Sequence, residues 1–170
     1  MNRLSLVLVD NRPSARDGIM ALIRAQPGFM VLAASAKPAA ALDQVREDRP
    51  NLVLLHLRPP GDEGLKVAGA LQGESPETRV IIVGLEPLHE DLAGFVRAGV
   101  SGFIMGNASM DRFLSTLRSV SRGIQVLPAE LTRALFRQLR YGDRKRPNRR
   151  PDVQRLPGYG RVEVAAWSLQ

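Results

Sequence analysis

An apolar run in the middle of the chain constrains the fold more than any other feature. Residues 51–61, Asn-Leu-Val-Leu-Leu-His-Leu-Arg-Pro-Pro-Gly, are almost continuously apolar and end in turn-forming residues. Such a run is typical of a strand that is buried on both faces of a parallel sheet. Ligand and catalytic groups of open α/β sheets gather at the carboxyl ends of the strands. His56 stands near that end of the run, so we interpret it as the first candidate site residue.

Strand-like and helix-like segments alternate along most of the chain. The apolar runs predict strands at 4–9, 29–34, the run that contains His56, 80–83 and 100–105. The apolar stripes and turn residues predict helices from 13 or 14 to the Pro27-Gly28 pair, and at 38–48, 61–72, 88–98 and between the N-cap Ser109 and Gly123. Five strand–helix units of this length predict an α/β fold, a doubly wound five-stranded parallel sheet with right-handed crossovers.

A further helix is predicted after this unit. Residues 125–127 are extended in character, and Pro128 opens a helical pattern that runs to about Arg140. Leu131, Leu135 and Leu139 recur every four residues on it, so the stripe must bury against the domain or against a partner helix. Both alternatives remain open at this point. The predicted organisation is a domain at 1–123, an extension helix at 124–140 and a basic, disordered tail at 141–170.

The positive charge of the chain is concentrated in that tail. Residues 141–170 hold seven basic and three acidic side chains and supply more than half of the net charge of +7. Proline and glycine content favours a solvated, disordered end, whereas the charge would also attract nucleic acid. The possible nucleic-acid contacts are Arg144, Lys145, Arg146, Arg149 and Arg150.

Several function classes are excluded by what the sequence lacks. The chain has no cysteine, which rules out disulfides, thiolate metal sites and thiol catalysis. No apolar run approaches the ~18 residues of a membrane span, so we expect no membrane association and a cytoplasmic location. No glycine-rich phosphate loop follows the first predicted strand, which argues against nucleotide binding of the Rossmann type.

The junctions between the predicted elements carry a resemblance to a known family. Residues 6–13 (Leu-Val-Leu-Val-Asp-Asn-Arg-Pro), 54–61, 80–84 and 98–104 look like a response-regulator receiver domain. Residues 123–140 further resemble the end of receivers in the NarL/FixJ subfamily. The likeness covers residues 1–140 and implies the flavodoxin-like receiver fold.

The resemblance also implies a phosphorylation site, of which little is left here. In that family an acidic pair after the first strand and an aspartate after the third hold Mg²⁺, and the aspartate is phosphorylated. A Ser or Thr after the fourth strand and a lysine after the fifth contact the phosphoryl group. The matching positions are Asp10 and Asn11, His56, Gly84 and Gly106. Only Asp10 keeps the chemical group of the family.

These replacements predict a domain without metal, cofactor or phosphotransfer. Mg²⁺ prefers hard oxygen ligands, and phosphoryl transfer depends on metal and cationic groups around the phosphate. We expect His56 to make a hydrogen bond or salt link to Asp10 in place of the metal, and a neighbouring carboxylate would favour the imidazolium. A half-exposed strand-end histidine is the alternative, and a phosphorylated histidine is the least favoured. We expect no enzymatic activity.

The leading functional hypothesis is an atypical, phosphorylation-independent receiver that acts as an interaction and dimerisation module in bacterial signal transduction and transcriptional regulation. The alternative is a DNA-associated regulator that uses the basic tail; a phosphoaccepting regulator is least favoured. The subfamily usually adds a helix-turn-helix domain. The thirty residues after 140 are interrupted by Pro147, Pro151 and Pro157, so we expect that domain to be absent.

The resemblance also leads to expectations about dimerisation and about the movement of Phe103. We expect a homodimer, or a heterodimer with another regulator, formed through the fifth and sixth helices. The predicted interface residues are Phe113, Leu117, Leu131, Leu135 and Leu139. Phe103 matches the aromatic residue that switches position in receivers, and no phosphate-driven movement of it is expected here.

Overall fold

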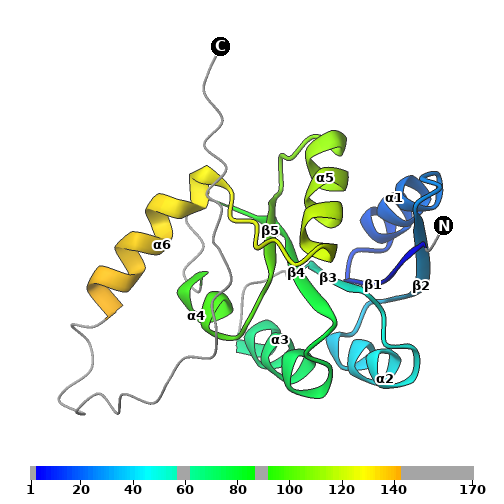
Figure 1. Ribbon diagram of the computed structural model, residues 1–170, viewed down its shortest axis with the longest axis horizontal. Helices are drawn as coiled ribbons and strands as arrows, with labels where there is room; N and C mark the ends of the chain where they lie inside the picture. Colours follow the sequence, from blue (N-terminus) through cyan, green and yellow to red (C-terminus); the bar gives the residue numbers. More distant parts are fainter. Residues whose placement is uncertain (1–2, 57–61, 87–91, 143–170) are drawn as a thin grey trace.

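The computed structural model of the chain describes residues 3–56, 62–86 and 92–142. They form a five-stranded parallel sheet in the order β2-β1-β3-β4-β5 (Figure 1). The strands are β1 (Leu4–Asp10), β2 (Phe29–Ser35), β3 (Leu52–His56), β4 (Arg79–Leu85) and β5 (Gly102–Met105). This architecture confirms the predicted doubly wound, flavodoxin-like fold with a five-stranded parallel sheet.

Helices cover both faces of the sheet. Figure 1 shows α1 and α5 on one face and α2, α3 and α4 on the other. Their bounds are α1 (Pro13–Arg24), α2 (Pro38–Asp48), α3 (Asp62–Glu74), α4 (Leu92–Arg97) and α5 (Met110–Ser121), and α6 (Ala129–Gly142) follows them. None of the helices in the described ranges is long and apolar enough to cross a membrane.

The apolar run around His56 is explained by this layering. Successive side chains of a strand point to opposite faces of the sheet. In β3, Leu52 and Leu54 pack in the core under α1 and α5, whereas Val53 and Leu55 pack in the core under α2 and α3. All four are fully buried, so the strand must be apolar at every position until it reaches the edge.

Local signals place most element boundaries. Pro13 and Pro38 stand in the first turns of α1 and α2, where the missing amide proton costs nothing. The Ser109 side chain accepts a hydrogen bond from the backbone N–H of Arg112 at 3.3 Å, as the predicted N-cap requires. The predicted strand at 100–105 begins only at Gly102, because the Val100 N–H still donates to the Phe95 carbonyl across the turn that follows α4. The predicted start of that helix, at residue 88, lies outside the described residues.

The segment after α5 closes the β5 edge of the sheet. The Phe103 N–H donates to the Val126 carbonyl at 3.0 Å, and the Val126 N–H donates to the Ser101 carbonyl at 3.1 Å. The predicted extended character of residues 125–127 is thereby confirmed. A β-bridge between Gly102 and Val126 leads the chain directly into α6.

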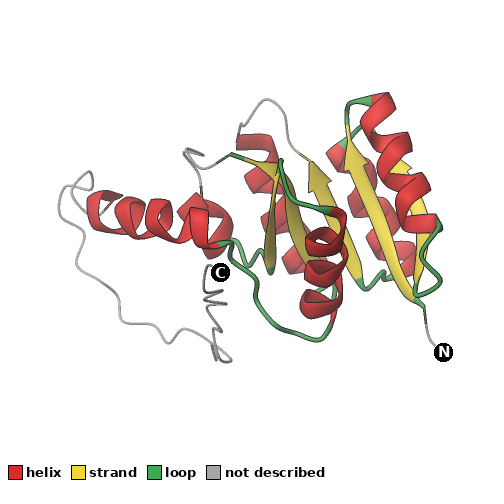
Figure 2. Cartoon of the chain, turned by 90° about the horizontal axis from the view of Figure 1, so that it is seen from above, coloured by secondary structure: helices red, strands yellow, loops and turns green. Residues whose placement is uncertain are grey.

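Helix α6 packs against α4 with only part of its length. Leu131 is fully buried, and Leu135 packs against the same core at intermediate exposure. The Gln138 side chain accepts a hydrogen bond from the Ala93 N–H at 2.9 Å. Figures 1 and 2 show the rest of the helix running away from the sheet, and there Phe136 is 63% and Leu139 46% exposed.

The interface prediction is corrected at the buried positions. Leu117 and Leu131 are both 0% exposed and Phe113 is only 8% exposed, because they form the core beneath α5 and α6. These side chains have no surface left to offer a partner in this protomer. Leu139 alone of the five predicted positions is exposed.

Candidate functional site

Asp10 and His56 meet at the carboxyl edge of the sheet. Asp10 is the last residue of β1, His56 is the last residue of β3, and the two are register partners in adjacent strands. Asp10 is 0% and His56 5% exposed, so two titratable groups are buried side by side. The alternative of a half-exposed strand-end histidine is therefore wrong. Asn11 follows Asp10 at the exposed surface.

Arg12 is the residue that sequence reasoning missed. Its backbone N–H and its Nε donate to Asp10 Oδ1 at 2.9 and 3.2 Å, and its Nη2 donates to Asp10 Oδ2 at 3.1 Å. Arg16 adds a hydrogen bond from Nη1 to the Asp10 backbone carbonyl at 2.9 Å. A basic side chain two residues after a buried carboxylate is the signal that would have indicated this pairing.

His56 stands closer to Arg12 than to Asp10. Its Nδ1 lies 3.6 Å from Asp10 Oδ1, which is an ion-pair distance but too long for a hydrogen bond. Its Nε2 lies 2.8 Å from Arg12 Nη2. The expected salt link to Asp10 therefore exists only as a longer-range contact, and the guanidinium of Arg12 is the group that joins the two strand ends.

The Arg12 contact decides the protonation of His56. A guanidinium carries only donors, so His56 Nε2 must accept this hydrogen bond with its lone pair. The ring is then neutral, with its proton on Nδ1 on the Asp10 side. The predicted imidazolium would place a proton on Nε2 that points at the guanidinium, so this geometry favours the neutral ring.

The Arg12 contacts also set the charge state of Asp10. Burial alone would raise the pKa of the Asp10 carboxyl, but hydrogen bonds from the side chain and backbone of Arg12, together with the charge of Arg12, outweigh this effect. The net result is a pKa below the ordinary value. Asp10 is thus a buried carboxylate at neutral pH, held in an ion pair with the partly exposed Arg12.

Gly84 makes room for the His56 ring. A Cβ added at Gly84 would lie 2.2 Å from His56 Nε2, and the residue has φ +80°, which side chains rarely adopt. The register between β4 and β5 shifts at this residue. The imidazole therefore fills the space beside the strand where the family carries a hydroxyl. Gly106 differs, because a Cβ there would meet only the Gly84 carbonyl at 3.7 Å, an ordinary contact.

The residues present do not fit Mg²⁺. Both oxygens of Asp10 already accept hydrogen bonds from Arg12, and β3 offers an imidazole instead of a carboxylate. A cation between the strand ends would also meet the Arg12 charge. Within the described ranges, no three His, Cys, Asp or Glu side chains gather as a metal site. The donor set is wrong for a hard cation.

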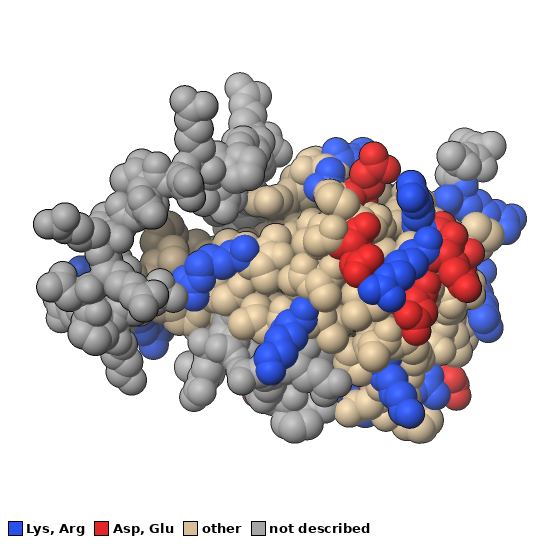
Figure 3. Space-filling view, turned by 90° about the horizontal axis from the view of Figure 1, so that it is seen from below, with Lys and Arg blue, Asp and Glu red and all other residues tan. Residues whose placement is uncertain are grey.

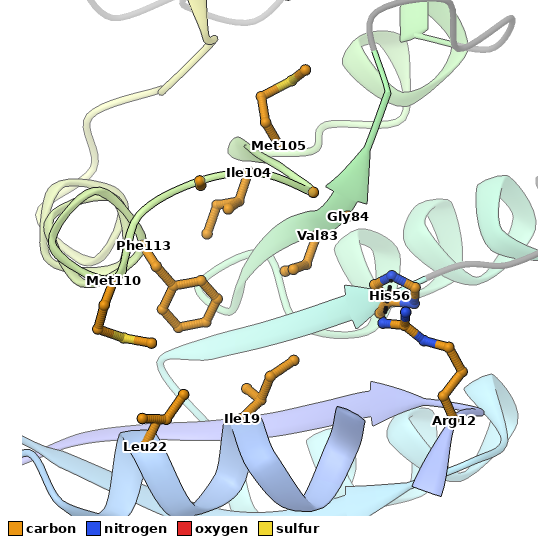
Figure 4. A pocket seen from close by; sticks show the side chains of 12 residues that line it. Arg12, Ile19, Leu22, His56, Val83, Gly84, Ile104, Met105, Met110 and Phe113 are labelled. Atoms are coloured by element: carbon orange, nitrogen blue, oxygen red, sulfur yellow. Dashed lines mark hydrogen bonds between the residues drawn. The ribbon is translucent and has the colours of Figure 1, made fainter. Parts of the chain in front are cut away.

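A cavity of about 270 Å³ opens beside this ion pair, between α1 and α5. Figure 4 shows Arg12 and His56 at one end of it and apolar side chains around the rest. Gly84 and Gly106 also line it, so three of the five predicted site positions line one space together with Arg12. Phe103 does not line it, because that side chain is buried in the core on the opposite side of the sheet.

The surface on the α2–α3 side carries mixed charges. Figure 3 shows acidic and basic side chains interspersed there. Arg46 pairs with Glu74 at 2.6 Å and with Asp43 at 3.5 Å. Among the described residues, this face presents no single-sign basic patch of the kind that attracts nucleic acids. The predicted basic contacts at 144–150 lie outside the described residues.

Comparison with known proteins agrees with the fold. The profile of the response regulator receiver domain matches residues 6–118. Oxygen regulatory protein NreC of Staphylococcus haemolyticus (strain JCSC1435) is 27% identical over 136 residues, which are 79% of this chain and 63% of that protein. The chain thus spans less than two thirds of the length of this relative.

Solved structures show the same fold. The LuxR-family two-component response regulator from Aurantimonas sp. SI85-9A1 superposes with a TM-score of 0.72 at 21% identity, over 81% of this chain and 99% of that one. RcsB of Salmonella enterica serovar Typhimurium, bound to promoter P1flhDC in the presence of the phosphomimetic BeF3-, gives 0.72 at 15% identity, over 86% and 73%.

Proposed function

Because the chain belongs to the response regulator receiver family, with relatives of the NarL/LuxR type, we propose that it is a receiver that works without phosphorylation. It serves as a protein-interaction module in two-component signalling and transcription regulation. One observation carries this proposal: the Arg12 guanidinium contacts both Asp10 and His56, at the two strand ends where the family binds metal and phosphate.

The ion pair between Asp10 and Arg12 makes the state of the domain independent of phosphorylation. A buried carboxylate that is already neutralised by a guanidinium of its own chain has no charge deficit for a metal to fill. The neutral imidazole at the phosphoacceptor position and Gly84 at the hydroxyl position remove the remaining reacting groups. Signals must then reach the domain through the molecules that bind it.

Millimolar Mg²⁺ and beryllofluoride should leave the melting temperature unchanged. A ligand that binds the native state at about 100 times its Kd stabilises it by about 2.7 kcal/mol, which a thermal melt detects easily. Differential scanning calorimetry of the full chain, with a phosphorylatable receiver as positive control, measures this. A rise in melting temperature with either ligand would contradict the proposal.

His56→Asp alone should not create a phosphorylatable domain. Arg12 would remain between Asp10 and the new carboxylate, and Gly84 and Gly106 still provide no hydroxyl or ammonium group. After incubation with acetyl phosphate and Mg²⁺, intact-mass spectrometry should show no phosphate adduct. His56→Asn is the matched control of equal size, and an adduct on the aspartate variant alone would show that the Arg12 contact does not block the site.

The exposed end of α6 supports a role in pairing. Phe136 and Leu139 are three positions apart and therefore lie on neighbouring parts of one helix surface, both exposed. A closed two-fold arrangement is the commonest outcome for a self-complementary patch. We infer a homodimer, or a heterodimer with another regulator, through this patch. DNA association through residues 144–150 stays a prediction.

The double variant Phe136→Glu/Leu139→Glu should be monomeric where the wild type is dimeric. Each chain would bury two carboxylates in the dimer interface, while the buried Leu131 and the packed Leu135 stay in place. Light scattering after size exclusion measures the mass. Met30→Glu, on β2 and 42% exposed in the wild type, is the control that should remain dimeric. A wild type that is monomeric at high micromolar concentration would show that the patch does not pair.

A further inference from the structure

We propose that the cavity between α1 and α5 is a binding site for a small organic acid with a compact apolar body and one carboxylate. This inference goes beyond the interaction role proposed above and does not depend on it. It stands on the shape of the cavity, on the division of its walls into an apolar part and a cationic end, and on a donor of Arg12 that faces no partner among the described residues.

The apolar part of the cavity comes from two helices and the sheet. Ile19 and Leu22 of α1 face Met110 and Phe113 of α5, with Val83 and Ile104 of the sheet lining the space as well (Figure 4). Leu22 and Met110 are 46% and 37% exposed, so they mark a side that is open to solvent. A volume of about 270 Å³ lies just below the usual range for ligand pockets and suits a small molecule.

The polar end of the cavity is cationic. Arg12 is the only charged side chain among the described residues that line it, whereas its partner Asp10 lies behind it. Nε and Nη2 of Arg12 are used by Asp10 and His56, and Nη1 has no hydrogen-bond partner in the described part of the chain. Arg16 brings a second guanidinium to this region, and it donates to the backbone carbonyl of Asp10 and not to the carboxylate. One positive charge therefore remains for an anion.

The two ends together select the ligand class. A carboxylate forms charge-assisted hydrogen bonds with a guanidinium, and such bonds are about twice as strong as neutral ones. Acetate and inorganic phosphate could also contact Arg12, but they have no apolar body to bury against the apolar walls and should bind more weakly. An aromatic or branched aliphatic body fills the space between Ile19 and Phe113.

Titration calorimetry with the full chain tests the site. The probes are phenylacetate, cyclohexylacetate and hexanoate, with phenylacetamide as the neutral match and acetate as the match without an apolar body. At least one of the three acids should bind saturably, with one site per chain, and the amide of phenylacetate should bind about tenfold more weakly than the acid. Failure of all three acids to saturate at millimolar concentration would overturn the proposal.

One variant tests the apolar, open side of the cavity, and a second tests its cationic end. Leu22→Glu places a like charge at the open side and should weaken binding of the acid by about tenfold or more, whereas Met30→Glu, which changes an equally exposed apolar residue that does not line the cavity, should leave it unchanged. Asp10→Asn/Arg12→Gln removes both charges together and should bind phenylacetate and phenylacetamide equally. Circular dichroism confirms that each variant is folded.

Two results would show that the cavity has another role. If the acid keeps its advantage over the amide in Asp10→Asn/Arg12→Gln, Arg12 does not recognise the carboxylate. If no acid binds and Leu22→Glu converts a dimer into a monomer, a second copy of the chain covers the cavity. The Mg²⁺ titration above is independent of both results, so failure of the ligand site and failure of the phosphorylation-independent role are distinguishable.

Discussion

Gly84→Ser, which restores a hydroxyl of the family at this position, should lower the free energy of unfolding by about 3 kcal/mol. The new Cβ would lie 2.2 Å from His56 Nε2, and serine would have to adopt φ +80°. The ring cannot swing aside cheaply, because His56 is 5% exposed and its Nε2 is hydrogen-bonded to Arg12 at 2.8 Å. Urea denaturation followed by circular dichroism measures the loss.

A second background separates the two causes of that loss. In His56→Ala the ring is absent, so Gly84→Ser should cost only the strain of the positive φ, about 1 kcal/mol. Gly106→Ser is the matched control, because its Cβ would make only ordinary contacts and its effect should stay within about 0.5 kcal/mol. If Gly84→Ser is as stable as the wild type, the imidazole does not lie over Gly84.

The fold could be predicted because burial leaves a direct mark on the sequence. Leu52 to Leu55 are apolar at every position since alternate side chains enter two different cores. Helix α2 was predicted with its observed bounds, Pro38–Asp48, because a proline opens it and its apolar residues are periodic. The location of Asp10 and His56 at a common site could also be predicted, because the carboxyl ends of parallel strands meet at one edge of the sheet.

The geometry of the contacts that Arg12 makes with Asp10 and His56 could not be predicted from the sequence. Arg12 reaches back to Asp10 because its backbone is extended, with φ −98° and ψ 107°, just before α1 begins. A pattern of residue types does not specify that turn, so the guanidinium went unrecognised. The charge of His56 was predicted from Asp10 alone, whereas its Nε2 lies 2.8 Å from Arg12 Nη2.

Helix α6 shows a second limit of sequence patterns. Leu131, Leu135 and Leu139 are equivalent in spacing, yet the first is fully buried and the last is 46% exposed. The helix contacts α4 as far along as Gln138, whose side chain accepts a hydrogen bond from the Ala93 N–H, and its far end extends away from the domain (Figure 1). A periodic stripe indicates which face of a helix is apolar, but the length of domain available to cover it is set by the tertiary structure.

Arg12→Gln should destabilise the protein by about 2–3 kcal/mol at neutral pH. The substitution leaves Asp10, which is 0% exposed, as a buried charge without its guanidinium. Removing the partner of a buried charge costs more stability than removing the partner of an exposed one. The value lies below that for a fully buried pair because the Arg12 side chain is itself 45% exposed and partly screened by solvent. Urea denaturation of both proteins gives the difference in the free energy of unfolding.

The pH dependence of that difference identifies Asp10 as its cause. In the wild type the folded pKa of Asp10 is lowered, so its stabilisation is present above the unfolded pKa of about 3.9 and disappears as pH falls through the folded value. In Arg12→Gln the hydrogen bonds that lower the pKa are gone and burial raises it, so the folded variant takes up a proton as pH falls and its penalty shrinks. The difference in the free energy of unfolding between the wild type and Arg12→Gln should therefore be largest at neutral pH and should decrease toward pH of about 4. The difference between the wild type and Asp10→Asn/Arg12→Gln should not decrease in this way. A difference for Arg12→Gln that does not change with pH would show that Asp10 is not the buried charge that Arg12 neutralises.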